Sequence, residues 1–154
     1  MRLSWDRYFL EIAKAVSLRA SCPRASSGCV LVDNNTKRIL ATGYNGAPAG
    51  ESNCLEVGCN VRETNGKHCK RTIHGEANTI YYADKYNVDY KNTTLYEYFE
   101  AHNEQTRGNY YPDSSMTQNL SDFPCEPCQI LLFERMVSKV ICSYGNGVIV
   151  TYII

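Results

Sequence analysis

The sequence lacks a long apolar run. None of its hydrophobic segments approaches the roughly 18 consecutive apolar residues that a membrane-spanning helix requires. The N-terminal segment MRLSWDRYFLEIAKAV carries acidic residues among its apolar ones, so we also expect no signal peptide. These absences argue against a membrane partner and favour a cytoplasmic protein.

An excess of one charge is lacking as well. Lys plus Arg number 16 and Asp plus Glu number 16, so the formal net charge is zero. Non-specific binding to nucleic acid needs a basic surplus that displaces counterions. We therefore expect no nucleic-acid partner, although a local basic pocket for one small anion fits this composition.

Cysteine, by contrast, is abundant, with eight residues in 154. A chain of this length is the size of one domain and can bury a core without disulfides. Two cysteines stand as Cys125-Glu-Pro-Cys128, and four more are spread over the first half of the chain: Cys22, Cys54, Cys59 and Cys69. In a reducing compartment such clusters more often bind metal than form disulfides.

Hydrophobic periodicity predicts alternating helices and strands. Trp5, Phe9, Ile12 and Val16 recur at helical spacing and favour a helix over residues 4–19. Further helices are expected at 73–87 and 125–136, and strands at 28–32, 38–42, 93–98, 137–142 and 148–153. This order indicates a single domain, 1–154, with an α/β fold. We expect a three-layer α/β/α sandwich around a mixed sheet of about five strands.

Three segments show no clear period. Residues 43–50 form a glycine-rich loop, GYNGAPAG, and residues 51–70 are polar and are expected to be irregular. A third segment, an insertion at about 98–122, is rich in Asn, Ser, Tyr and Gln. A loop of this length inside a compact domain is usually functional or disordered.

The segment FPCEPC opens the last predicted helix. Cys125 and Cys128, at i and i+3, lie on one face of its first turn, where the helix dipole favours thiolates. Thiolates suit Zn²⁺, and a catalytic zinc needs three protein ligands and one open position. His74, which begins the helix predicted at 73–87, is a candidate third ligand. A lone Cys-x-x-Cys also occurs in redox and structural zinc sites.

Glu76 follows His74 by two residues and would point into the site without binding the metal. Zinc lowers the pKa of bound water to about 7, and a neighbouring carboxylate can pass that proton to leaving ammonia. The pattern H-x-E followed by P-C-x-x-C is the signature of zinc nucleobase deaminases. A non-catalytic zinc-binding module is the alternative, but a structural site has no need of Glu76.

On these residues the chain resembles the deoxycytidylate (dCMP) deaminase family, of viral, phage or bacterial type, within the cytidine-deaminase-like superfamily. The matching segments are WDRYFLEIAKAVSLRASCPR, GYNGAPAG, SNCLEVGCNV, HCKRTIHGEAN and FPCEPC. The resemblance implies zinc-dependent hydrolysis of dCMP to dUMP and ammonia, a step toward dTTP. It also implies a cytoplasmic location, in the host cytoplasm if the protein is viral.

The resemblance implies a role for each motif residue. His74, Cys125 and Cys128 would hold the catalytic zinc, and Glu76 would carry the proton. The expected substrate contacts run from the base to the phosphate: Gly75, Asn45, Arg24, Arg19 and Tyr144. Arginine suits a phosphate because its planar guanidinium donates hydrogen bonds in pairs.

Regulation and a second metal site are implied in the same way. The family is typically a homo-hexamer that dCTP with Mg²⁺ activates and dTTP inhibits. The residues expected at an effector site between subunits are Tyr44, Asn45, Gly46 and Gly50. The residues expected to hold a structural zinc are Cys22, Cys54, Cys59 and Cys69, with His68 as a substitute ligand. Reduced thiols without metal are the alternative, since cysteine is often a small buried hydrophobe.

Several alternatives stay open. The sequence does not separate dCMP from dCTP as substrate, whereas neutral charge disfavours a tRNA base and Arg24 disfavours a free nucleoside. Gly75 stands where the family usually has alanine. The insertion at about 98–122 enters directly above the zinc-ligand turn, where it would act as a lid or an intersubunit arm.

Overall fold

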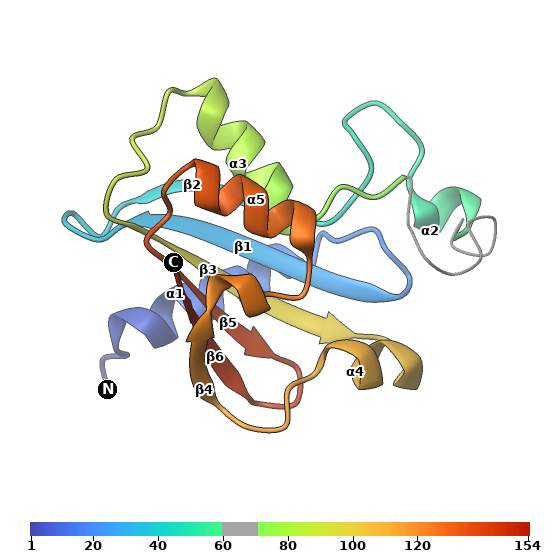
Figure 1. Cartoon of the computed structure of the whole chain (residues 1–154). Helices are drawn as coiled ribbons and strands as arrows, with labels where there is room; N and C mark the ends of the chain where they lie inside the picture. The colour runs from blue at the N-terminus through green and yellow to red at the C-terminus, as the bar shows by residue number, and fades with distance from the viewer. Residues whose placement is uncertain (60–70) are drawn as a thin grey trace.

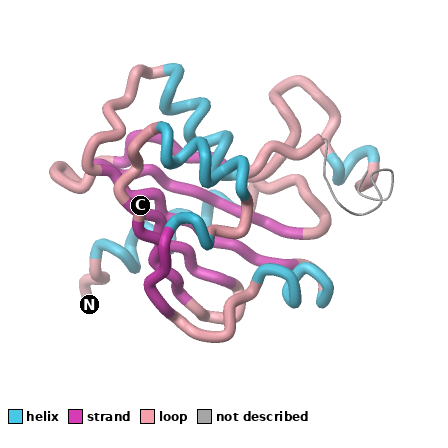
Figure 2. The backbone as a smooth tube through the Cα atoms, viewed as in Figure 1, coloured by secondary structure: helices cyan, strands magenta, loops and turns pink. Residues whose placement is uncertain are grey.

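The computed structural model describes residues 1–59 and 71–154 (Figures 1 and 2). Its elements in chain order are α1 (Trp5–Ser17), β1 (Ala25–Asp33), β2 (Ile39–Tyr44), α2 (Cys54–Val57), α3 (Gly75–Lys85), β3 (Thr93–Ala101), α4 (Glu104–Tyr110), β4 (Met116–Asn119), the 3₁₀ turn η2 (Leu120–Asp122), α5 (Glu126–Glu134), β5 (Lys139–Tyr144) and β6 (Ile149–Ile153). No helix among the described residues is long and apolar enough to cross a bilayer.

The strands form one mixed sheet of six, in the order β2-β1-β3-β5-β6-β4. β1 pairs antiparallel with β2 and β3, whereas β3 and β5 run parallel and β6 turns back against β5. The sixth strand, β4, pairs parallel with β6 at the edge and comes from the insertion. The predicted mixed α/β architecture is thus confirmed.

Helices cover both faces of the sheet, which gives the three layers (Figure 1). β1 shows why: its side chains alternate between two apolar cores. Val30 and Val32 pack with Phe9 and Ala13 of α1 on one face. Leu31 packs in the second core, on the opposite face of the sheet, where α3 and α5 lie side by side.

Gly28 shows how closely α1 approaches the sheet. A Cβ atom at this position would stand 2.1 Å from the carbonyl oxygen of Ala13 and 2.3 Å from the nitrogen of Ser17. Both are backbone atoms, which cannot move aside without shifting the helix. The absence of a side chain at Gly28 therefore lets α1 lie directly on β1.

The insertion at 98–122 has regular structure in place of the long loop that its polarity suggested. β3 continues to Ala101, and α4, β4 and η2 follow. Two contacts fix it to the rest of the domain: Asn146 donates to the Pro112 carbonyl at 3.0 Å, and the Ile149 N–H donates to Ser115 at 2.9 Å. Within it, the Ala101 N–H donates to the Tyr111 hydroxyl at 2.9 Å. Its elements are too short for a hydrophobic period to reveal them.

Candidate metal and active site

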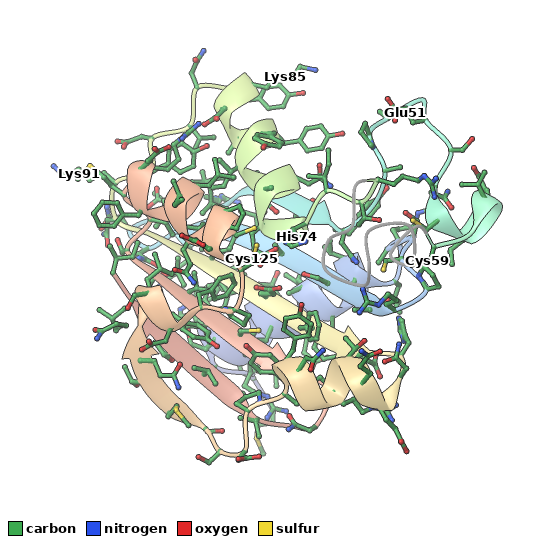
Figure 3. All side chains as sticks on the ribbon, turned by 45° about the vertical axis from the view of Figure 1, so that its right-hand side comes forward. Glu51, Cys59, His74, Lys85, Lys91 and Cys125 are labelled. Carbon is green, nitrogen blue, oxygen red and sulfur yellow. The ribbon has the colours of Figure 1, made fainter. Side chains whose placement is uncertain are left out.

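The N-termini of α3 and α5 meet over the sheet, as the sequence predicts. His74 is the N-cap residue of α3 and Cys125 that of α5, while Cys128 lies in the first turn of α5. In Figure 3 the labelled side chains of His74 and Cys125 lie next to each other, and Cys59 lies apart from them, toward α2. One ligand atom from each of His74, Cys125 and Cys128 lies within 4.8 Å of the other two.

The spacing of these atoms fits a tetrahedral zinc ion. Cys128 Sγ and His74 Nδ1 are 3.6 Å apart. A tetrahedral ion with a sulfur ligand at about 2.3 Å and a nitrogen ligand at about 2.0 Å places the two atoms about 3.5 Å apart. Two sulfurs and an imidazole nitrogen also form the donor set that zinc prefers. The three residues therefore fit zinc in both chemistry and distance.

The electrostatics of the two thiols favour metal binding. A hydrogen bond from Cys128, aided by His74, lowers the pKa of Cys125 to about 4. The hydrogen bond to Cys125, together with burial, raises the pKa of Cys128. At neutral pH one of the two sulfurs is therefore already a thiolate, the form that binds metal.

Glu76 lies beside this triad and is only 6% exposed. Burial raises the pKa of its carboxyl, against a lowering by His74. A carboxyl whose pKa moves toward neutrality is better suited to take up and release a proton near the operating pH. The position and pKa of Glu76 thus fit the proton carrier expected from the sequence.

A second buried acid, Glu97 of β3, was not anticipated from the sequence. It is 3% exposed and lines the same cavity. The Ser27 hydroxyl donates to its Oε1 at 2.8 Å, while its Oε2 has no hydrogen-bond partner among the described residues. Strand register places it between the buried thiols Cys29 and Cys142. Burial, followed by repulsion from Glu76, raises the pKa of Glu97 well above its usual range, which favours the protonated carboxyl.

The sequence held one signal for Glu97. It is the acid within LYEYF, and a carboxyl surrounded by apolar and aromatic residues in a buried strand is costly unless it has a partner or a function. What the sequence could not supply was its neighbours, because Ser27 and Glu76 reach it only through the pairing of β1 with β3 and the packing of α3.

A cavity of about 630 Å³ opens beside the triad, within the size range of small-molecule sites. Of the expected substrate contacts, Arg24, Asn45, Gly75 and Tyr144 line it, together with His74, Glu76 and Cys125. Arg19 is exposed just beyond the C-cap of α1 and lies outside the lining. The proposed phosphate contact of Arg19 therefore gains no support from this cavity.

Two of the expected contacts also hold the structure together. The Asn45 amide accepts from the Ser27 N–H at 2.8 Å and donates to the Ala25 carbonyl at 2.9 Å, which fastens the glycine-rich loop to β1. Tyr144 is 3% exposed, and its hydroxyl lies 2.8 Å from that of Tyr152. Their roles toward the sugar and phosphate stay predictions.

The segment expected to bind an effector begins as the end of β2, which reaches Tyr44. Gly46 forms a two-way backbone bridge with Ile73, with N···O distances of 2.9 and 3.1 Å. Gly50 adopts a φ of 86°, a backbone conformation that favours glycine. The loop is thus coupled to the residue that precedes His74, while effector binding by Tyr44, Asn45, Gly46 and Gly50 stays a prediction.

Three cysteines of the expected structural zinc site line the same cavity: Cys22, Cys54 and Cys59. Arg71 donates to the Gly58 carbonyl at 2.7 Å, and its Nη1 lies 3.8 Å from Cys54 Sγ. The remaining expected ligands, Cys69 and His68, lie outside the described residues. The second zinc site therefore stays a prediction.

A family model described as the cytidine and deoxycytidylate deaminase zinc-binding region matches residues 3–144. The chain belongs to this family. The resemblance drawn from its motifs is thereby confirmed. The matched residues 3–144 include His74, Glu76, Cys125 and Cys128.

Individual relatives agree with this family assignment. The deoxycytidylate deaminase of Saccharomyces cerevisiae is 37% identical over 146 residues, covering 93% of this chain and 38% of that protein. The ComE operon protein 2 of Bacillus subtilis is 39% identical over 62% of this chain and 48% of its own length. The deoxycytidylate deaminase of Mycobacterium phage D29 is 36% identical over 62% of this chain and 77% of that protein. The chain therefore spans less than half the length of the first two relatives.

Solved structures establish the same fold. The dCMP deaminase of cyanophage S-TIM5, in complex with dCMP and dUMP, has a TM-score of 0.64 at 21% identity, covering 97% of both chains. The cytidine deaminase of Burkholderia pseudomallei has a TM-score of 0.59 at 15% identity, covering 96% of this chain and 91% of that one.

Proposed function

We propose that the protein is a zinc-dependent deaminase that hydrolyses dCMP to dUMP and ammonia. The observation that carries the proposal is the buried Glu76 carboxyl beside the His74, Cys125 and Cys128 triad, at the wall of a nucleotide-sized cavity. Support for dCMP comes from the relatives named deoxycytidylate deaminase and from the cyanophage dCMP deaminase solved with dCMP and dUMP.

His74, Cys125 and Cys128 would hold the zinc, and the metal would supply Lewis-acid activation of the attacking water. Glu76 accepts a proton from that water and returns it to the amino nitrogen at C4 of the pyrimidine. The C4–O bond forms first, the C4–N bond then breaks, and the protonated nitrogen leaves as ammonia. The first N–H groups of a helix lack intrahelical acceptors. The N–H of Gly75, which lines the cavity, can therefore donate to the pyrimidine carbonyl.

The wider role follows the family resemblance. Deamination of dCMP would feed dTTP synthesis in the cytoplasm, with dCTP and Mg²⁺ as activator, dTTP as inhibitor and a homo-hexamer as the assembly. Tyr44, Asn45, Gly46 and Gly50 would contribute to the effector site, and a structural zinc would occupy the cysteine cluster that includes Cys22, Cys54 and Cys59. Deamination of dCTP itself is the alternative substrate reaction.

Ammonia release from dCMP by the wild type and by Glu76→Gln tests the proposal. The variant keeps the size of the side chain but cannot carry the proton, so we expect kcat to fall by about 100-fold or more. Glu11→Gln, at an exposed position on α1, is the matched control and should retain full activity.

Elemental analysis of the wild type, Glu76→Gln and Glu11→Gln measures their zinc content, and so separates loss of the proton carrier from loss of zinc. Wild-type protein that holds zinc and releases no ammonia from dCMP or dCTP would overturn the enzyme assignment and favour a non-catalytic zinc module. Full activity of Glu76→Gln would instead overturn only the role of Glu76.

A further inference from the structure

The insertion helix α4 forms part of the wall of the active-site cavity. Its cavity-lining residues follow one helical face: Gln105, Thr106, Asn109 and Tyr110. Glu104, just before them in sequence, and Arg107, between Thr106 and Asn109, are exposed and lie outside the lining. One face of the helix thus borders the cavity, and Gln105 and Asn109 bring side-chain amides to it.

α4 is held firmly enough to place these amides. Asn103 caps the helix, since its Oδ1 accepts from both the N–H and the hydroxyl of Thr106 at 2.8 Å. At the other end, Tyr111 binds the backbone of Ala101, and the ring of Tyr110 packs edge-on against Phe99 of β3 at 5.7 Å. The Asn103 cap therefore fixes the start of the helix, and the Tyr111 hydrogen bond and the Tyr110 ring contact join its C-terminal end to β3.

The start of α4 lies beside Arg24. The His102 N–H donates to the Arg24 carbonyl at 2.9 Å, and the His102 ring lies 2.7 Å from the Ser26 hydroxyl. Among the described lining residues Arg24 is the only lysine or arginine, whereas Glu76, Glu97 and Glu126 are acidic. A phosphate dianion at this end of the cavity needs more donors than one guanidinium supplies, and neutral amides supply them without further charge.

We propose that Gln105 and Asn109 bind the phosphate of the substrate beside Arg24 and thereby select a nucleotide over a nucleoside. The inference rests on the proposed deamination of dCMP and assigns a specificity role to the insertion. The zinc triad and Glu76 act on the base, and α4 recognises the other end of the same molecule.

Steady-state kinetics of Gln105→Ala and Asn109→Ala with dCMP and with deoxycytidine test the inference. A hydrogen bond to a charged group is among the stronger ones, so each change should raise KM for dCMP about tenfold. We expect kcat for dCMP and kcat/KM for deoxycytidine to change less than twofold. A parallel loss of affinity for dUMP, measured by calorimetry, would support binding of the phosphate end independently of turnover.

Glu104→Gln is the matched control, because it alters the solvent side of the same helix, and its KM should equal that of the wild type. The inference is overturned if both alanine variants keep the wild-type KM for dCMP, or if they lose deoxycytidine and dCMP turnover equally. An absence of dCMP turnover in the wild type would overturn the proposed function itself, which is a distinct result.

Discussion

Gly75→Ala is the most informative single substitution, because it places the alanine expected from the family resemblance between His74, a proposed zinc ligand, and Glu76, the proposed proton carrier. Gly75 has no positive φ, so its backbone does not require glycine. What it lacks is space: a Cβ atom would stand 2.9 Å from Ser27 Oγ and 3.2 Å from Cys29 Sγ. The new methyl group must therefore displace the Ser27 hydroxyl.

That hydroxyl is the hydrogen-bond donor to Glu97, at 2.8 Å. Overpacking a core position costs about 1–3 kcal/mol. Leaving a buried polar group without its partner costs about 1–3 kcal/mol. Replacing glycine by alanine in a helix returns about 0.5–1 kcal/mol. The two costs overlap because both arise from one displaced hydroxyl, and we expect Gly75→Ala to lower the free energy of unfolding by about 2 kcal/mol.

Urea unfolding of the zinc-loaded protein at one fixed zinc concentration measures this change, since bound metal adds to stability. Ser27→Ala completes a double-mutant cycle, because it removes the atom that the methyl group meets. In the Ser27→Ala background the added methyl should cost at least about 1 kcal/mol less than in the wild type. A Gly75→Ala protein as stable as the wild type, or two substitutions with additive costs, would refute the steric reasoning.

Two further predictions concern charge and metal. Burial and Glu76 raise the pKa of Glu97 well above 4.5 in the folded protein, so folding favours the protonated carboxyl. The contribution of this group to folding stability is therefore full below about pH 4.5 and is lost as the pH rises through the folded pKa. Glu97→Gln cannot ionise, so in urea unfolding its stability relative to the wild type should rise steadily from about pH 5 to about pH 8, whereas a pH-independent difference would contradict the shift. Elemental analysis should find two zinc ions per wild-type chain and one in Cys128→Ala; one zinc in the wild type would remove the second site.

The grouping of His74, Cys125 and Cys128 could be predicted because its signals are local. His74 and Glu76 stand two apart at the start of one periodic segment, and Cys125 and Cys128 stand three apart at the start of another. Helix geometry alone then places each pair on a single turn. Only the meeting of the two turns required the sheet, and the alternation of helices and strands was enough to indicate it.

Other features depend on pairings that no local pattern encodes. Ser27 and Glu97 are 70 residues apart and come together through the register of β1 with β3. Nothing in the sequence around Asn45 indicates that its amide fastens a loop to Ala25 and Ser27. Within the insertion, α4 has seven residues and β4 has four, so polar composition outweighed any periodicity.

The insertion is separated in the structure from the turn that carries Cys125. After β3 the chain passes through α4 and the edge strand β4, and it re-enters the core at Leu120 and Phe123, which are 5% and 4% exposed. The Phe123 N–H donates to the Leu120 carbonyl at 2.9 Å, and its ring packs edge-on against Tyr152 at 5.0 Å. This anchor fixes the chain two residues before Cys125, so the turn that carries Cys125 has a support of its own in the core. The recognition proposed for α4 can therefore be tested separately from the chemistry proposed for Glu76.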